Sequence, residues 1–200
     1  MSSISAVLAT LYMPIDVPEG FIYRSDFLSE GEEEQLLERI KDIEFSEFRM
    51  RDKIARRRVA HFGWLYGYDS AQIEPGPPIP EFLRSLQKRA AALLEIEPNE
   101  LVEALLTKYP PGAGIGWHRD AWVFGTVVAV SLLSPCRLRL REGASAKTRV
   151  SIDIEPRSAY VLRGAVRSRW QHTISPTKAL RYSITFRTLR TSQKKRARNV

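Results

Sequence analysis

The spacing of hydrophobic residues divides the chain into a helical first half and a β-rich second half. Ser29 and Glu32 form a capping-box pattern, so a helix is expected to begin there. Pro80 marks the expected start of a second helix, at its first position. The apolar residues at helical spacing are Leu36, Leu37, Ile40 and Ile43 in the first helix, and Phe82, Leu83, Leu86, Ala90, Leu93 and Leu94 in the second.

After Pro98 the pattern changes to short strands separated by turns. The continuous apolar run Val127–Leu133 predicts a strand that is buried on both faces. Strict alternation over Arg137–Arg141 predicts a strand with one buried and one basic face. Further strands are predicted over Val150–Ile154, Ala159–Leu162, Trp170–Ile174 and Arg181–Thr188, whereas Leu101–Tyr109 is ambiguous by pattern alone.

Many short strands at nearly regular spacing are typical of an antiparallel sandwich or barrel. With the helices placed first, the expected fold is mainly β with flanking helices, an α+β arrangement in which a jelly roll has supporting helices on one side. The 200 residues suit one domain with a sizeable core.

The cysteine count and the N-terminal sequence bear on the cellular location of the protein. The single cysteine, Cys136, excludes an internal disulfide and fits a reducing cytoplasm. The apolar stretch Ala6–Ala9 has no basic residue before it, which argues against a signal peptide, and no segment reaches membrane-spanning length. We therefore expect a cytoplasmic protein.

The net charge of +8 favours an anionic partner such as nucleic acid. Part of this excess lies in the last ten residues, in Lys194, Lys195, Arg196 and Arg198. A basic chain end of this kind is more often solvated and disordered than a specific site.

Three polar residues are candidate metal ligands. His118 and Asp120 form an H-x-D pair whose side chains leave the same face of an extended segment, and His172 lies in a predicted strand. Two histidines and one carboxylate are the ligands of non-heme Fe(II) sites that leave coordination positions open. An H-x-D pair alone is common by chance, and catalytic zinc with the same ligands stays an alternative. His61 is interpreted as structural, or at most as a residue on the substrate side.

The segment Arg181–Arg187 is a candidate seat for a dicarboxylate. Strand periodicity puts Arg181, Ser183, Thr185 and Arg187 on one face, and Tyr182, Ile184 and Phe186 on the other. An arginine buried inside a barrel needs a partner for its charge, and a bound carboxylate would supply one. The opposite orientation, with both arginines facing solvent, is equally reasonable by pattern. Arginines beside an open iron would favour an oxygenase that uses 2-oxoglutarate.

The segment Tyr109–Ala113, the H-x-D pair, the distal His172 and Arg181–Arg187 together resemble the AlkB family of Fe(II)/2-oxoglutarate dioxygenases. The family pattern is N-x-Y-x-P-G, H-x-D, a distal H and R-x-N-x-T-F-R, and the resemblance extends from about Gly20 to Leu189. It implies a double-stranded β-helix (the jelly roll), with Leu101–Tyr109 as a strand that leads into the metal loop.

The resemblance also implies roles for individual residues. His118, Asp120 and His172 would bind Fe(II); Arg181 and Tyr109 would hold the far carboxylate of 2-oxoglutarate, and Arg187 would lie near the end that chelates the metal. Thr107 and Ser183 stand where the family often has asparagine, so the hydrogen bonds around the co-substrate differ. O2 is the other co-substrate.

The same resemblance gives a domain plan: an N-terminal extension over residues 1–19, one dioxygenase domain over 20–190 and a basic C-terminal tail over 191–200. Within the domain, a nucleotide-recognition lid would span about 45–75 and the jelly-roll core about 100–190.

Arg57–Trp64 resembles the R-x-V-x-H-[FY]-G-[YW] stretch of the tRNA-modifying branch. Members of that branch can carry extra RNA-binding and methyltransferase domains, for which this chain is too short.

In this family the lid grips the substrate base. We expect substrate contacts from Arg58, Trp64, Tyr66, Tyr68 and Trp122. Aromatic side chains stack on an extracted base, and arginines contact phosphate. Trp122 stands where some DNA-repair members carry an acidic residue. An amphipathic strand with core aromatics is the alternative, because Phe62 shares the strand face of Trp64 and Tyr66.

The leading hypothesis is oxidative demethylation or hydroxylation of an alkylated or modified base in DNA or RNA, with Fe(II), 2-oxoglutarate and O2. A second hypothesis keeps this chemistry but takes a methylated protein side chain as substrate. A third is a basic nucleic-acid-binding protein whose catalytic centre is idle.

Overall fold

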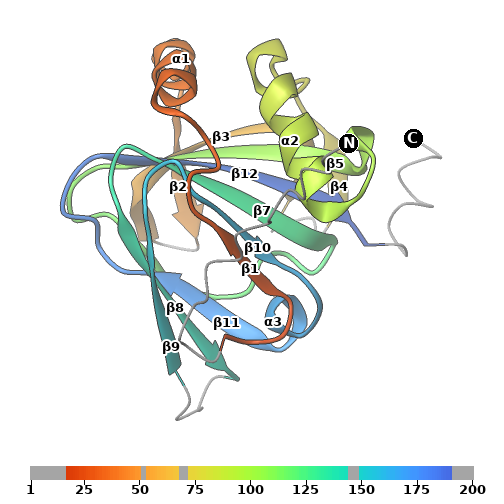
Figure 1. Ribbon diagram of the computed structural model, residues 1–200, viewed down its shortest axis with the longest axis vertical. Coiled ribbons are helices and arrows are strands. Elements are labelled where there is room, and N and C mark those ends of the chain that lie inside the picture. Colours follow the sequence, from red (N-terminus) through yellow and green to blue (C-terminus); the bar gives the residue numbers. More distant parts are fainter. Residues whose placement is uncertain (1–16, 51–52, 68–71, 144–148, 191–200) are drawn as a thin grey trace, which may run out of the picture.

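Two antiparallel sheets face each other, and two helices cover the outer side of the larger sheet (Figure 1). This computed structural model describes residues 17–50, 53–67, 72–143 and 149–190, so residues 1–16 of the predicted extension and the tail 191–200 lie outside it. The larger sheet has the order β1 (Phe21–Arg24), β10 (Ala159–Leu162), β7 (Phe124–Leu132), β12 (Arg181–Leu189), β5 (Leu101–Tyr109), β3 (Lys53–Gly67) and β2 (Ser46–Met50), with β4 (Gln72–Pro75) paired to β3. The smaller sheet has the order β6 (Ile115–His118), β11 (Trp170–Ile174), β8 (Cys136–Glu142) and β9 (Arg149–Ile154).

The prediction of a mainly β fold with flanking helices is therefore confirmed. The ambiguous segment Leu101–Tyr109 is the strand that the family resemblance implies. The predicted strand Val127–Leu133 begins earlier, at Phe124, and ends at Leu132. Leu133 lies outside the strand because its backbone is left-handed, with φ of 70°.

One of the two predicted helix starts agrees with the structure, and the other does not. Helix α1 (Glu30–Ile40) begins at Ser29 with the predicted capping box, in which the Glu32 carboxylate accepts a hydrogen bond from the Ser29 amide at 2.8 Å. The second helix begins later than predicted. Pro80 has an extended backbone and precedes a short 3-10 turn, η1 (Glu81–Leu83), and helix α2 (Arg84–Leu94) follows that turn. Two further short elements are η2 (Pro98–Glu100) and α3 (Gly164–Ser168).

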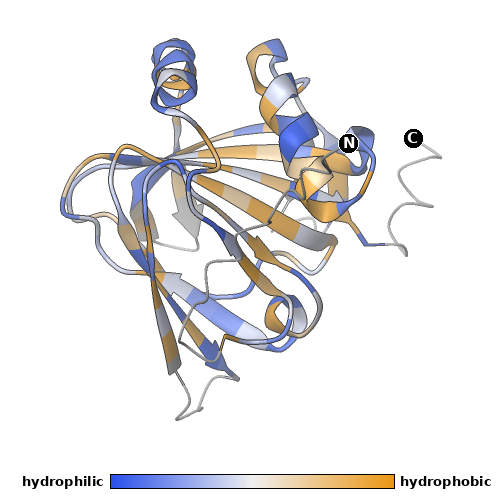
Figure 2. Cartoon of the chain, in the orientation of Figure 1, coloured by the Kyte–Doolittle hydropathy of each residue, from blue (hydrophilic) through white to orange (hydrophobic). Residues whose placement is uncertain are grey.

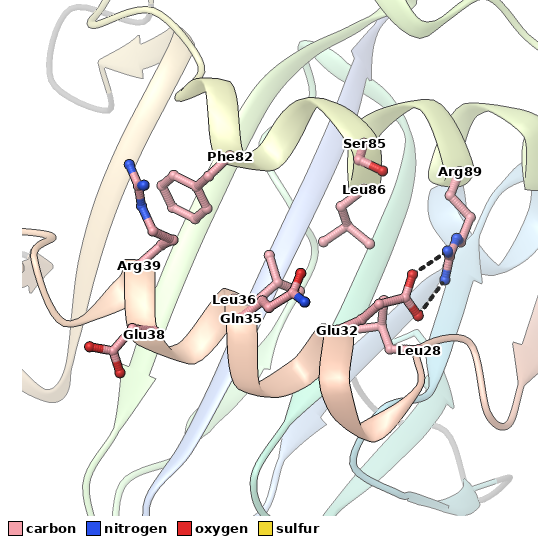
Figure 3. Close-up of a pocket in the computed structure, with 10 residues that line it drawn as sticks. All are labelled: Leu28, Glu32, Gln35, Leu36, Glu38, Arg39, Phe82, Ser85, Leu86 and Arg89. Carbon is pink, nitrogen blue, oxygen red and sulfur yellow. Dashed lines mark hydrogen bonds and ion pairs between the residues drawn. The ribbon is translucent and has the colours of Figure 1, made fainter.

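Helices α1 and α2 are joined across a groove of about 530 Å³ (Figure 3). Leu36 and Leu86 lie between the helices, and the Glu32 carboxylate accepts hydrogen bonds from the Arg89 guanidinium. The bond from Arg89, with that from Ser29, lowers the pKa of Glu32 to about 2. The candidate metal ligands do not line this groove, so we assign the helix pair a supporting role.

The large sheet is buried on both faces, and Figure 2 shows hydrophobic residues concentrated along its strands. Ile184 and Phe186 of β12 pack against the helices, in one core. Between the sheets lies a second core that includes Val127, Leu138 and Leu140. The opposite face of β12, which carries Arg181, Ser183 and Thr185, is also buried. The structure therefore excludes the alternative in which both arginines face solvent.

None of the helices in the described part of the chain combines the length and the hydrophobicity that crossing a bilayer requires.

Candidate metal centre and co-substrate site

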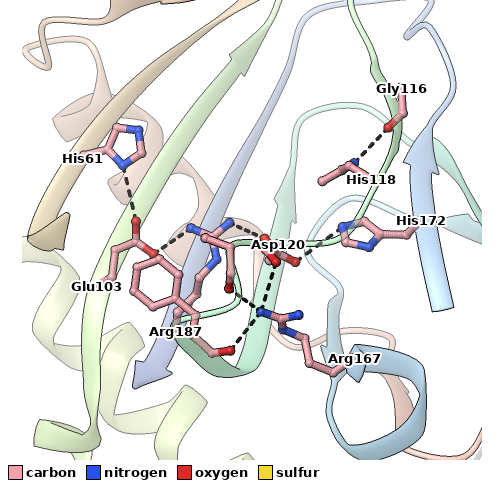
Figure 4. Close-up of polar contacts among 10 residues, drawn as sticks. His61, Glu103, Gly116, His118, Asp120, Arg167, His172 and Arg187 are labelled. Carbon is pink, nitrogen blue, oxygen red and sulfur yellow. Dashed lines mark hydrogen bonds and ion pairs between the residues drawn. The ribbon is translucent and has the colours of Figure 1, made fainter. Parts of the chain in front are cut away.

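The three candidate metal ligands converge at one end of the small sheet (Figure 4). His118 of β6 and His172 of β11 are directly opposite each other in the strand register, and their ring centroids are 4.2 Å apart. Asp120 follows β6 in a loop, with its Oδ2 3.5 Å from His172 Nε2. One potential ligand atom from each residue lies within 4.8 Å of the other two. Residues far apart in sequence thus form one cluster.

The environment of this cluster fits a cation. Asp120 Oδ2 is buried and has no hydrogen-bond partner among the described residues. A buried carboxylate oxygen without a donor is costly, and a bound metal would satisfy it. His118 Nδ1 lies 2.8 Å from the Gly116 carbonyl oxygen, so Nδ1–H donates there and Nε2 is left to bind metal.

The charges of the cluster suit metal binding as well. Burial, together with His118, lowers the pKa of His172 to about 3, and burial also lowers the pKa of His118. Both imidazoles are therefore neutral near pH 7, as a metal ligand must be. Burial alone would raise the pKa of Asp120, but Arg187, His172 and Arg167 hold it well below its usual range. The site thus presents two neutral nitrogens and one anionic oxygen.

This electrostatic arrangement predicts acid sensitivity of the metal-free protein. The pKa of His172 is about 3 in the folded state and near its ordinary 6.5 in the unfolded state, so only the unfolded chain takes up this proton between those values. The contribution of His172 to the free energy of unfolding is fully present above about pH 6.5. Below that pH it falls by about 1.4 kcal/mol for each pH unit of acidification. Between about pH 6.5 and pH 5 we expect a loss of about 2 kcal/mol from this residue, measured by urea denaturation. In the variant His172→Gln, the free energy of unfolding should depend less steeply on pH over this range. An equal dependence in the variant and the wild type would contradict the low pKa assigned to His172.

Arg167 anchors the loop that carries Asp120. Its Nη2 donates to the backbone carbonyls of Ala121 at 2.8 Å and Phe124 at 2.9 Å, with a longer contact to the carbonyl of Asp120. The side chain is only 6% exposed. Sequence reasoning missed this residue, because an arginine in a short polar segment gives no signal that it is buried.

Arg187 is held by carboxylates of the protein itself. Its Nη2 donates to Asp120 Oδ1 and its Nη1 to Glu103 Oε2, both at 2.6 Å. Figure 4 shows this chain of contacts from Glu103 through Arg187 to Asp120. Arg187 thus lies beside the candidate metal ligands, where the resemblance places the chelating end of 2-oxoglutarate, and its contact with the co-substrate stays a prediction.

Arg181 is 1% exposed, yet much of its guanidinium is unpaired. Its Nε donates to Ser131 Oγ at 3.0 Å, and its Cζ lies 4.8 Å from the Tyr109 ring centroid. Nη1 and Nη2 are buried and have no hydrogen-bond partner among the described residues. Two parallel N–H groups with no partner match the geometry of a carboxylate. The site therefore fits an anionic co-substrate.

The other residues predicted for the co-substrate lie on the same sheet face as Arg181. In the pairing of β12 with β5, Arg181 is opposite Tyr109 and Ser183 is opposite Thr107, and all four are buried. Ser131, which sequence reasoning did not single out, joins them from β7. The sequence does not point to Ser131, because a single serine within an apolar strand matches no functional motif.

A cleft of about 220 Å³ opens over the candidate metal ligands. It is lined from the small sheet side by Trp117, His118 and Asp120, and from β12 by Arg187. On the other side its lining residues include Phe48, Arg57, His61, Tyr66, Glu103 and Thr107. The cleft is thus bounded by both sheets.

The predicted substrate residues do not all reach this cleft. Tyr66 lines it, and its hydroxyl accepts a hydrogen bond from Trp122 Nε1 at 3.2 Å; the Trp122 side chain is 50% exposed. Trp64 lines a different groove, with Pro75 and Gly76. Arg58 is exposed and does not line the cleft, whereas its neighbour Arg57 does. Tyr68 lies outside the described residues.

Gly63 explains why Tyr66 and Phe62 do not share a side. Phe62 packs against the helix-side core, although strict alternation would place it with Tyr66. Gly63 has φ of +82°, and a Cβ there would lie 2.1 Å from the Val102 carbonyl oxygen, so glycine is required. Beyond Gly63 the strand stops pairing with β5 and pairs with β4. The prediction that Phe62 shares the strand face of Tyr66 is therefore wrong.

His61 belongs to the wall of the cleft. Its Nδ1 lies 3.3 Å from Glu103 Oε1, and its side chain is 34% exposed. A carboxylate can only accept hydrogen bonds, so Nδ1–H of His61 donates to Glu103. The sequence interpretation of a structural or substrate-side residue is thus refined, because His61 is oriented by Glu103 and lines the cleft.

Comparison with known proteins identifies the family. The model of the 2OG-Fe(II) oxygenase superfamily matches residues 20–187. The chain belongs to this superfamily. It is a dioxygenase that depends on Fe(II) and 2-oxoglutarate and uses O2, so the cofactor predictions are confirmed and iron is favoured over zinc. A catalytically idle binder is correspondingly disfavoured.

Curated relatives confirm the resemblance to AlkB proteins and to their tRNA-modifying branch. The chain is 26% identical over 186 residues to the Xenopus tropicalis tRNA (carboxymethyluridine(34)-5-O)-methyltransferase alkbh8, covering 89% of this chain and 28% of that protein. It is 23% identical over 185 residues to an Arabidopsis thaliana protein described as alkylated DNA repair protein ALKBH8 homolog, covering 80% and 51%. The chain thus spans between a quarter and about half of the length of these relatives.

Two solved structures share the fold. OsALKBH1 superposes with a TM-score of 0.71 at 15% identity, covering 86% of this chain and 98% of that one. A Trichoplax adhaerens prolyl hydroxylase, solved in complex with a hypoxia inducible factor oxygen degradation domain peptide fragment, gives a TM-score of 0.63 at 18% identity, covering 90% and 87%. The expectation of a jelly-roll oxygenase fold is therefore confirmed.

Proposed function

We propose that this dioxygenase oxidatively demethylates or hydroxylates an alkylated or modified base in nucleic acid. The observation that carries the proposal is the wall of the cleft: Arg57, His61 and Tyr66 face the candidate metal ligands, and Trp122 lies against Tyr66. Aromatic rings can stack on a base, and a guanidinium can contact its phosphate. The net charge of +8 and the names of the relatives, which refer to tRNA and to alkylated DNA, support the same substrate class.

Each residue of the metal centre has a proposed task. The Nε2 atoms of His118 and His172 and the carboxylate of Asp120 would hold Fe(II), which with 2-oxoglutarate and O2 supplies the oxidising power to hydroxylate a C–H bond. Arg187 fixes one oxygen of Asp120, which leaves Oδ2 for the metal. Arg167 fixes the backbone of that ligand and of the residues that follow it, up to Phe124.

The substrate and co-substrate would occupy different parts of the inner face. Arg181 would bind the far carboxylate of 2-oxoglutarate, with Tyr109, Thr107 and Ser183 around it. The target base would enter the cleft, which is bounded by both sheets, so it must leave its stack or come from a single strand. Hydroxylation of an N-methyl group would give a product that collapses and releases formaldehyde.

The single buried cysteine is compatible with a cytoplasmic location, which we include in the proposal.

The decisive test is a substrate screen with the full chain, Fe(II), ascorbate and 2-oxoglutarate. Methylated oligonucleotides of RNA and DNA, tRNA and methylated peptides would be compared by succinate, formaldehyde and product mass. We expect mass changes in nucleic acid and none in peptide. Oxidation of peptides alone would refute the proposal in favour of a protein substrate.

Arg181→Met is expected to weaken use of 2-oxoglutarate selectively. Hydrogen bonds to a charged group contribute roughly 1.5–3 kcal/mol, so the KM for 2-oxoglutarate should rise about 10- to 100-fold. Arg181→Lys keeps the charge without the forked donors and should lie between wild type and Arg181→Met. Kinetics at varied 2-oxoglutarate measure the effect, and metal binding by the same variants serves as the control. A KM within about twofold of wild type would contradict the assigned role.

A further inference from the structure

The outer face of the small sheet carries an aromatic and basic cluster next to the cleft. Leu138 and Leu140 of β8 are fully buried, so strand alternation turns Arg137, Arg139 and Arg141 to the outer side. The Cζ of Arg141 lies 4.4 Å from the Trp117 ring centroid, and that of Arg139 lies 5.7 Å from it. We call Trp117, Arg139 and Arg141 the outer basic surface.

The three arginines of β8 differ in what neutralises them. Arg137 donates through Nε and Nη2 to the two oxygens of Asp153, at 2.8 and 3.1 Å. Arg141 donates only to the neutral amide oxygen of Gln171, at 2.8 Å. Within the described part of the chain, neither Arg139 nor Arg141 forms an ion pair. Uncompensated positive charge is therefore concentrated around Trp117.

The outer basic surface is continuous with the cleft. Trp117 directly precedes His118 and itself lines the cleft. The opposite wall has a similar pair, because the Cζ of Arg57 lies 4.1 Å from the ring centroid of Phe48 and both residues line the cleft. A chain that places one unit over the metal ligands can thus meet an arginine and an aromatic ring on either side.

We propose that the outer basic surface binds the segment of a single-stranded polynucleotide next to the base held in the cleft. This inference rests on the proposed function, since it takes the substrate to be nucleic acid. Positively charged tracks with aromatic rings bind single strands through phosphate contacts and base stacking, with little dependence on sequence. Arginine planes also stack on bases, and Arg141 is held in place by both Trp117 and Gln171.

The test compares substitutions with equal charge change on one strand. Binding of labelled single strands of about 12 nucleotides, as RNA and as DNA, is measured by fluorescence anisotropy over a range of salt concentrations. Arg139→Ser and Arg141→Ser should each weaken binding about fivefold and reduce the slope of log K against log salt by about 0.7, the contribution of one phosphate contact. Arg137→Ser, on the same strand and face, should weaken it by less than about twofold, because Asp153 already neutralises Arg137. Trp117→Leu should weaken binding about tenfold through lost stacking.

Equal losses in all three arginine variants would overturn the proposal, because they would indicate diffuse charge. Unchanged binding in Arg139→Ser and Arg141→Ser would overturn it as well, and so would preference for an acidic peptide or a duplex. Tight binding of RNA or of DNA supports it and shows which sugar is accepted. If strands bind through this surface but no modified base is oxidised, only the proposed function fails. If modified bases are oxidised and the variants bind single strands like wild type, the proposed role of the outer basic surface is refuted and the proposed function stands.

Discussion

Replacing His172 with alanine is expected to abolish 2-oxoglutarate-dependent succinate formation. Within the described residues, the substitution removes one of three clustered candidate ligands, and the strand register places no other metal-ligating side chain opposite His118. Loss of a residue that merely supports a ligand lowers metal affinity or activity about 10- to 100-fold, so loss of the ligand itself should exceed about 100-fold.

The measurement is succinate yield at saturating Fe(II), together with direct metal binding by the folded variant. Thr173→Ser is a matched control from the same strand, since it keeps the hydroxyl that donates to the Ile115 carbonyl oxygen. It should remain close to wild type. Near-normal turnover by a folded His172→Ala protein would refute the metal assignment.

Replacing Arg187 with methionine is expected to destabilise the metal-free protein by roughly 3–5 kcal/mol. Arg187 is the shared partner of Glu103 and Asp120, whose side chains are 1% and 6% exposed. Burial alone would lower the pKa of Arg187, but these two carboxylates raise it well above its usual range. Without the guanidinium, Asp120 and Glu103 would lose the cation that they share, and Glu103 would keep only its contact with His61.

Urea and thermal denaturation measure this loss, which corresponds to a fall in Tm of about 10 °C for a chain of this size. Arg187→Lys should lose less, because it keeps the charge, and the double substitution Arg187→Met with Glu103→Gln should recover part of the stability. Added metal should also restore some, since a cation can neutralise Asp120. A loss below about 1 kcal/mol would show that the ion pairs are weak.

The cluster of candidate metal ligands could be predicted because its signal is local. The H-x-D spacing places two side chains on one face, and Trp170–Ile174 is recognisable as a strand that carries a histidine. The orientation of Arg181 could not be settled from the sequence, because both faces of β12 are buried and each face packs against a different part of the molecule. Alternation shows which residues share a face, but not which face meets which partner.

The residues that were missed or misplaced depend on tertiary contacts. Arg167 and Glu103 look like ordinary surface charges in the sequence, and only the folded chain pairs them with the metal loop and with Arg187. Trp64 was proposed as a substrate contact because it is an aromatic residue of the segment that the resemblance assigns to the lid, and the groove that it lines with Pro75 and Gly76 is formed only in the folded chain. The glycine between Phe62 and Tyr66 is visible in the sequence, but its positive φ is not.

Gly63 also separates two kinds of evolutionary constraint within one strand. Before it, β3 is fixed by pairing with β5 and by the helix-side core, so changes there would disturb folding. After it, the described part of the strand pairs with the short hairpin partner β4, and it carries Tyr66 toward the cleft. Related enzymes could therefore diversify the hairpin and acquire new substrate preferences while inheriting an unchanged scaffold.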